Sequence, residues 1–136
     1  SIPYQLYIDL ILPYSKRILN AARENNCPTI FFPKDIGNGV SIIDKSICDY
    51  VSVDWHTPID HARKIIDSEL GIQGNMDPRI FYQDYSEIEE YLNSLINFGS
   101  QNQNWIFNLG HGFLPDIDHK KVKFVVDWIK DKDWNR

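Results

Sequence analysis

Short apolar runs alternate with amphipathic segments along this 136-residue chain. The runs at residues 29–32, 50–54, 70–75 and 105–109 predict strands, and the segments between them have helical spacing. Helices that connect successive strands make those strands parallel and neighbouring. Such a chain forms either an open doubly wound sheet or a closed barrel, and periodicity does not separate the two.

The segments between the strands predict helices with one apolar face each. The first covers residues 4–24, with a kink or a join at Pro13. The next begins at Thr57 and Pro58, and another begins with a capping box of Ser86 and Glu89 and ends near residue 99. The last begins near residue 116 or 118, and a brief helical stretch is expected at 40–46. The face of the first helix that we expect to point inward consists of Leu6, Leu10, Ile11, Tyr14, Ile18, Leu19 and Ala22. The corresponding face of the last helix consists of Val122, Val125, Val126 and Ile129.

Composition limits the class of protein. The length suits one domain, and 43% hydrophobic with 24% charged residues is typical of a soluble globular chain. A net charge of −5 with scattered Lys and Arg makes nucleic acid an unexpected partner. Neither a membrane span of about 20 apolar residues nor a signal peptide is seen. Cys27 and Cys48 have no metal-binding spacing, so we expect reduced thiols rather than a disulfide.

Polar residues follow the ends of the predicted strands. Asp54 and Asn75 are the last residues of two of the apolar runs, and Lys34 and His111 lie two residues after the other two. In a barrel of parallel strands these ends converge on one face, where active sites are built. We therefore expect the four residues at one end of the sheet.

His111 is the leading candidate for a binding residue. It lies between Gly110 and Gly112 at the end of an apolar strand, so the backbone can turn and a ligand can approach the ring. The alternative is a histidine that only caps a turn through its own backbone.

Other motifs favour structural roles. Asp54 and His56 are expected on one face with Trp55 on the other, which allows a two-ligand metal site, but a metal needs three or four ligands and no further pair has the required spacing. His61 and His119 are expected at the surface. The run from Gln73 to Pro78 matches no phosphate-binding fingerprint, and we expect Asp77 to start the turn there. No serine or cysteine has the setting of a nucleophile.

In order and spacing, several motifs resemble the C-terminal part of the uroporphyrinogen decarboxylase family. They are Leu12-Pro13-Tyr14, Phe31-Phe32, Val53-Asp54-Trp55, Gln73-Gly74-Asn75-Met76-Asp77-Pro78 and Phe107-Asn108-Leu109-Gly110-His111-Gly112. The resemblance covers nearly the whole chain. It implies an α/β fold, the (β/α)₈ TIM barrel, of which residues 1–136 would be the C-terminal half, about four βα units of a single domain.

The resemblance also implies a function. Members convert the four acetate side chains of uroporphyrinogen III to methyl groups, giving coproporphyrinogen III, without a metal or an organic cofactor. Of the family's functional residues only His111 carries over, as a substrate-binding residue. The Arg-rich loop, strand-end Asp, Tyr and Ser are expected N-terminal to Ser1, so no catalytic residue is assigned here. The full-length enzyme is expected to be a cytoplasmic homodimer.

Two alternatives remain at this point. Corrinoid-linked methyltransferases resemble the same family but bind zinc through His and Cys at the barrel mouth. Cys27 and Cys48 precede strands rather than follow them, which disfavours such a site. The other alternative is a non-catalytic porphyrin-binding barrel.

Overall fold

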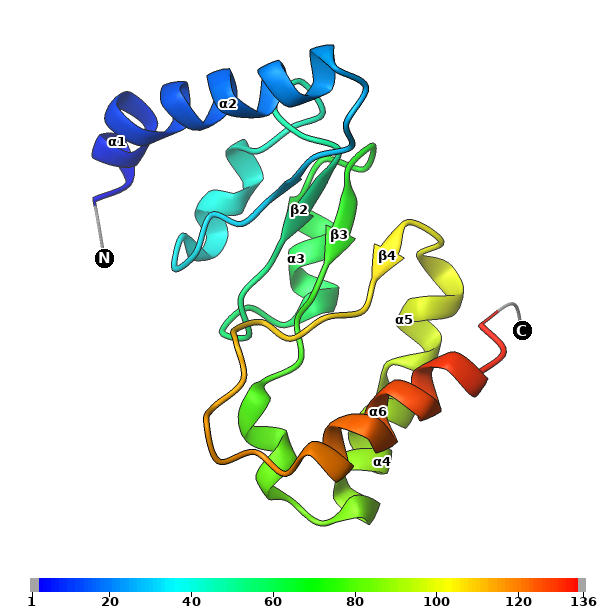
Figure 1. Cartoon of the computed structure of the whole chain (residues 1–136). Helices are drawn as coiled ribbons and strands as arrows, with labels where there is room; N and C mark the ends of the chain where they lie inside the picture. Colours follow the sequence, from blue (N-terminus) through cyan, green and yellow to red (C-terminus); the bar gives the residue numbers. More distant parts are fainter. Residues whose placement is uncertain (1–2, 135–136) are drawn as a thin grey trace.

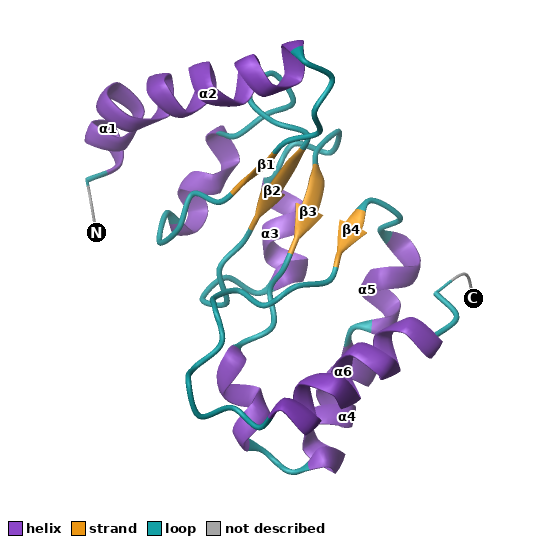
Figure 2. Cartoon of the chain, viewed as in Figure 1, coloured by secondary structure: helices purple, strands orange, loops and turns teal. Residues whose placement is uncertain are grey.

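One sheet of four parallel strands organises the chain (Figure 2). The computed structural model describes residues 3–134. The strands, in the spatial order β1-β2-β3-β4, are Ile30–Phe31, Tyr50–Ser52, Gly71–Gln73 and Trp105–Ile106. This confirms parallel, neighbouring strands connected mainly by helices. The arrangement is α/β and consistent with part of a barrel.

The strands are shorter than predicted, but their pairing continues beyond them. The Val53 amide donates to Gln73, the Gly74 amide to Ile106, and the Met76 amide to Asn108. Met76 and Leu109 also form an isolated parallel bridge. Backbone pairing therefore leads the chain from each strand toward the polar residues that follow it.

A nearly continuous helix precedes β1. It comprises α1 (Tyr4–Leu6), a π-helical turn (Tyr7–Ile11) and α2 (Leu12–Glu24). The predicted interruption at Pro13 takes the form of this wider turn, because proline lacks the N–H that an α-helical turn needs at that point. The short helix expected at 40–46 is instead a 3₁₀ helix, Gly37–Ile42.

Two of the remaining helices begin at other residues than predicted. Helix α3 is Ile59–Ile65, and no Thr57 side chain caps it; Pro58 is its first flanking residue. A 3₁₀ helix, Pro78–Tyr82, precedes α4 (Tyr85–Ser94). The capping box of α4 is Asp84 with Glu87, two residues earlier than the predicted Ser86 with Glu89. The helix then breaks at Leu95 into α5 (Ile96–Gln101), and α6 is His119–Asp131, capped by Asp118 as expected.

The core lies between the sheet and these helices. Its larger cluster joins Val51 and Ile72 of the strands, and Val53 just after β2, to α3 and the first 3₁₀ helix. A second cluster, around Met76, Leu92 and Val125, joins α4 to α6. The second cluster contains Met76, with Leu109 packed against it, so the segments that follow β3 and β4 are held by packing.

The inward face predicted for the first helix is wrong in part. Leu6, Leu10, Tyr14 and Ile18 are exposed, Ile18 by 72%. Leu12 and Leu19 do pack on the larger cluster. Figure 1 shows why: the N-terminal end of this helix projects away from the sheet, so no described element covers the rest of its apolar face. Val126, also predicted inward, is 43% exposed because α6 meets the core mainly through Val125. No described helix is both long enough and apolar enough to cross a membrane.

Candidate functional site

A pocket of about 550 Å³ opens along one face of the sheet and continues to the C-terminal ends of the strands. Its lining combines apolar surface with a few polar groups. The lining residues are Ile30, Phe32, Lys34, Ser52, Gln73, Asn108, Leu109, His111, Gly112 and Phe113. It spans all four strands or the segments that follow them, which is the position where parallel α/β folds bind ligands.

Alternation along the strands decides which side chains face this pocket. Val51, Val53 and Ile72 point to the opposite, helix-covered face and are buried. Their neighbours Ser52 and Gln73 therefore face the pocket, as residues paired in register. The Gln73 amide nitrogen donates to the Ser52 hydroxyl at 3.2 Å. This dyad is a polar patch on the pocket wall, and no motif in the sequence points to it.

His111 lines the pocket, at the end of the sheet where the sequence pattern predicted it. Its side chain is exposed, and Nδ1 lies 3.3 Å from the carbonyl oxygen of Gly112. This contact is the turn interaction of the alternative interpretation. The two interpretations are compatible, because one ring nitrogen meets the turn while the ring remains open to the pocket.

The loop after His111 is held at two further points. Phe113 contacts the Phe81 ring, with 5.8 Å between the centroids. The Tyr82 hydroxyl donates to an Asp116 carboxylate oxygen at 2.6 Å, which raises the pKa of Tyr82. The 3₁₀ helix before α4 thereby anchors the loop that carries His111.

Asp54 and Asn75 lie at the same end of the sheet as Lys34 and His111, but in a structural network. The Asn75 amide nitrogen, buried, donates to the carbonyl oxygens of Asp54, at 2.9 Å, and Thr57. The Asp54 carboxylate accepts from the backbone amides of Asp35, at 3.1 Å, and His56, at 3.0 Å. These bonds hold the loops after β1, β2 and β3 together.

Asp35, Asp54 and His56 are the described residues that come nearest to a metal-binding arrangement, with candidate ligand atoms all within 4.8 Å of one another. Asp54 and His56 approach each other as predicted, at 3.3 Å. The prediction that Trp55 faces the opposite way is wrong: its ring stacks on His56 with 3.9 Å between centroids. The chain turns after Val53, so strand alternation does not apply there. Both carboxylate oxygens of Asp54 already accept hydrogen bonds from protein groups, which indicates a structural role.

Arg79 lies beside these residues, in contact with Trp55 and Asp77, and no sequence motif pointed to it. Its guanidinium carbon lies 4.1 Å above the Trp55 ring, and its Nη2 donates to Asp77 at 2.7 Å. Burial raises the pKa of Asp77, but the bonds from Arg79 outweigh burial and lower it overall. The Asp77 carboxylate also accepts from the Arg79 amide, as expected for a residue that starts a turn. His61 and His119 are exposed, as predicted.

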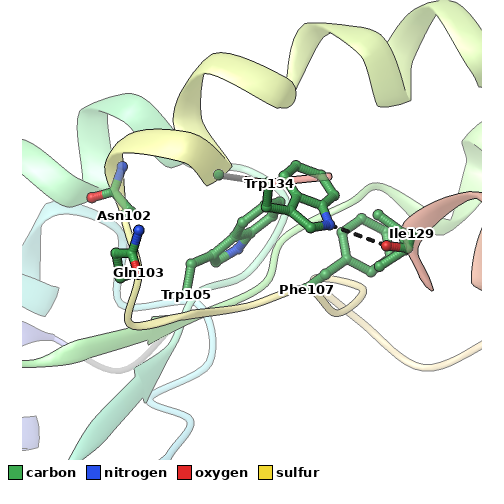
Figure 3. Close-up of a pocket in the computed structure, with 7 residues that line it drawn as sticks. Asn102, Gln103, Trp105, Phe107, Ile129 and Trp134 are labelled. Atoms are coloured by element: carbon green, nitrogen blue, oxygen red, sulfur yellow. Dashed lines mark hydrogen bonds between the residues drawn. The ribbon is translucent and has the colours of Figure 1, made fainter. Parts of the chain in front are cut away.

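A second pocket, of about 260 Å³, lies beside β4 and is drawn in Figure 3. Trp105, Phe107 and Trp134 line it with aromatic rings. Both indole N–H groups donate hydrogen bonds to backbone carbonyls. Trp134 donates to Ile129 at 3.1 Å, and Trp105 donates to Gly74 at 2.7 Å. None of the described residues that line it has a titratable side chain, so this pocket is a poorer candidate for chemistry.

Charge distinguishes the larger pocket. Lys34 and His111 are cationic or can become so, and none of the described residues that line the pocket is Asp or Glu. The chain as a whole has a net charge of −5, so this distribution is local. A pocket with apolar walls, cationic groups and no carboxylate suits a ligand with an apolar body and anionic substituents.

Comparison with known proteins agrees with the motifs. Residues 1–132 match the family described as uroporphyrinogen decarboxylase (URO-D). The chain is 33% identical over 123 residues to the uroporphyrinogen decarboxylase of Trichlorobacter lovleyi, covering 90% of this chain and 36% of that protein. It is 36% identical to that of Wigglesworthia glossinidia brevipalpis, covering 90% and 33%. The chain thus spans about a third of the length of these curated relatives. It belongs to the uroporphyrinogen decarboxylase family.

Proposed function

We propose that the protein containing this chain is a uroporphyrinogen decarboxylase, which converts the four acetate side chains of uroporphyrinogen III to methyl groups and releases coproporphyrinogen III. The observation that carries this proposal is the larger pocket, in which apolar walls meet the basic side chains of Lys34 and His111 and none of the described lining residues is Asp or Glu. Uroporphyrinogen III has the matching chemistry: a ring of four pyrroles whose rim bears carboxylates.

The reaction requires an acceptor for an electron pair. Protonation of a pyrrole at a ring carbon makes the ring cationic, and the bond between the acetate CH₂ and its carboxylate then breaks. Carbon dioxide leaves, and the electron pair of that bond neutralises the ring as an exocyclic enamine. Protonation of the exocyclic carbon forms the methyl group, and loss of the proton first added to the ring carbon restores the pyrrole. The substrate supplies its own electron sink, so no metal or organic cofactor is proposed.

In this scheme His111 binds the substrate. An imidazole at the mouth of the pocket can donate a hydrogen bond to a substrate carboxylate, and the bond is stronger when the ring is protonated. Residues that protonate the pyrrole are proposed to come from elsewhere in the enzyme.

We also propose that these residues form the C-terminal half of a (β/α)₈ barrel. Each outermost strand, β1 and β4, pairs with one neighbour among the described strands. Their outer edges would pair with strands from the rest of the barrel. By its likeness to the family the enzyme is further proposed to be a cytoplasmic homodimer.

The direct test is to incubate the native full-length protein with uroporphyrinogen III under anaerobic conditions. Chromatography of the porphyrins after oxidation should show successive products with seven, six, five and finally four carboxylates. Recovery of only the eight-carboxylate compound would contradict the proposal. Methyl transfer from a corrinoid to a thiol would assign the protein to the methyltransferases instead.

A further inference from the structure

Lys34 is held at the edge of the larger pocket by its neighbours in sequence. Its backbone amide donates to the Phe32 carbonyl at 3.0 Å, and Pro33 beside it is buried. The next amide, of Asp35, donates to the Asp54 carboxylate at 3.1 Å, and Asp35 has a positive φ of 61°. The backbone on both sides of Lys34 is thus fixed, so the side chain starts from a defined position at the pocket.

The ammonium group of Lys34 is only weakly paired. The contact to Asp35 is 3.9 Å from Nζ to Oδ2, and both side chains are about half exposed. Ion pairs of this length between exposed groups contribute little and are screened by salt. No carboxylate lines the pocket among the described residues, so a bound anion would compete only with this contact.

Lys34 and His111 follow the two outermost strands, β1 and β4. Three inter-strand steps of about 4.8 Å separate such strands by about 14 Å along the sheet. One carboxylate cannot bridge that distance. A ligand that engages both residues must present anionic groups on separate parts of its rim, with an apolar body between them.

We propose that Lys34 is a second substrate-binding residue, which binds a carboxylate of the tetrapyrrole on a different pyrrole from the carboxylate held by His111. This assignment rests on the proposed function. Two anchors on separate rings would fix the macrocycle against rotation in its plane. They would thereby select which acetate side chain lies at the reacting position.

The test uses steady-state kinetics of the native full-length protein with three variants. Lys34→Gln removes the charge and should raise KM roughly tenfold, the effect of losing about 1.4 kcal/mol of binding, with kcat changed much less. Lys34→Arg retains the charge and should stay within about threefold of the wild-type KM. Lys130→Gln, an exposed position on α6, is the matched control for loss of one charge and should leave KM unchanged.

Two further measurements separate direct binding from a structural effect. The KM of Lys34→Gln should depend less on salt than the wild-type KM, because one ion pair is missing. The KM effects of Lys34→Gln and His111→Asn should multiply in the double variant, because the two residues hold different carboxylates. Thermal unfolding of each variant reports whether the fold is retained.

The outcomes distinguish this inference from the proposed function. If wild-type protein decarboxylates uroporphyrinogen III and Lys34→Gln has the wild-type KM, Lys34 is not a binding residue and the function stands. An equal rise in KM for Lys34→Arg and Lys34→Gln also overturns the inference. If the wild-type protein has no decarboxylase activity, the proposed function fails and the role of Lys34 fails with it.

Discussion

A methyl group added at Gly110 would lie 2.3 Å from the backbone nitrogen of Trp55. The segment after β4 therefore touches the turn after β2 so closely that only glycine fits. The contact involves backbone on both sides, so no side chain can rotate away to make room. The residue next to this contact is His111, whose position in the pocket depends on it.

Gly110→Ala should consequently destabilise the fold by about 1–3 kcal/mol, the usual cost of overpacking. Urea unfolding measures the change. Gly112→Ala is the matched control, because an added Cβ there meets nothing within 4 Å. Equal stability of the two variants would show that the segments separate freely.

Replacing His111 with Asn tests whether this residue binds the substrate or transfers a proton. Asn can still donate a hydrogen bond but carries no positive charge, so a binding role predicts a raised KM and a modest fall in kcat. Partly decarboxylated porphyrinogens should be released, because the substrate must be repositioned for each of the four rounds. A general acid would instead lose roughly 10²- to 10⁴-fold in kcat with KM little changed. Wild-type values of both parameters would leave only the turn contact with Gly112.

Asp49 should make stability depend on acid pH. The Thr29 backbone amide donates to its carboxylate at 2.9 Å and is the main cause of its lowered pKa, aided by the Thr29 hydroxyl, Arg23 and Lys45. The pKa of Asp49 in the folded protein lies below the ordinary value of 3.8. The stability that this carboxylate contributes is therefore present above pH 3.8 and is lost as the pH falls through the folded pKa.

We therefore expect Asp49→Asn to lower the free energy of unfolding at pH 7 and to flatten its decline below pH 4. Urea unfolding at a series of pH values between about 2.5 and 7 measures both effects. The two proteins should differ in the pH dependence of unfolding by on the order of one bound proton. Asp60→Asn, at an exposed position on α3, serves as the control. Parallel pH profiles for wild type and Asp49→Asn would contradict this account.

The two cysteines should differ in reactivity. Both are free, but Cys48 is buried, which raises its pKa to about 11, whereas Cys27 is exposed. A thiol reagent near pH 8 should label Cys27 in the native protein and Cys48 only after unfolding. Mass spectrometry identifies the labelled residue, and Cys27→Ser should abolish native labelling. Rapid labelling of Cys48 in that variant would show that the core opens locally.

Decarboxylase activity should survive EDTA. The carboxylate of Asp54 is occupied by backbone amides, and both cysteines precede strands at the end of the sheet opposite the pocket. Loss of activity on chelation, with recovery on addition of zinc, would favour the methyltransferase alternative.

The sequence pattern predicted the parallel order of the strands, because short apolar runs separated by helical segments have few other solutions. It also placed Lys34 and His111 at one end of the sheet, which the pocket confirms. It did not identify Ser52 and Gln73. Alternation shows that a strand has two faces, and only the assembled sheet shows which face is left open to a pocket.

Helix boundaries and faces were predicted less well. Ser86 with Glu89 and Asp84 with Glu87 have the same capping spacing, and the structure uses the second pair. A tertiary contact accompanies this choice: the ring of Tyr85, the first residue of α4, meets Phe124 of α6 with 5.1 Å between centroids. Likewise, an apolar helical face shows that Ile18 can be buried, but not whether another element covers it.

The order of the strands has a consequence for synthesis of the chain. Each strand pairs in register with the one translated just before it, about 20 residues earlier for β2 and β3 and about 33 for β4. Closing such short loops costs little entropy compared with pairing distant segments. When β2, β3 or β4 leaves the ribosome, the strand with which it pairs has already been synthesised. The sheet can therefore grow in the direction of translation before synthesis of the chain is complete.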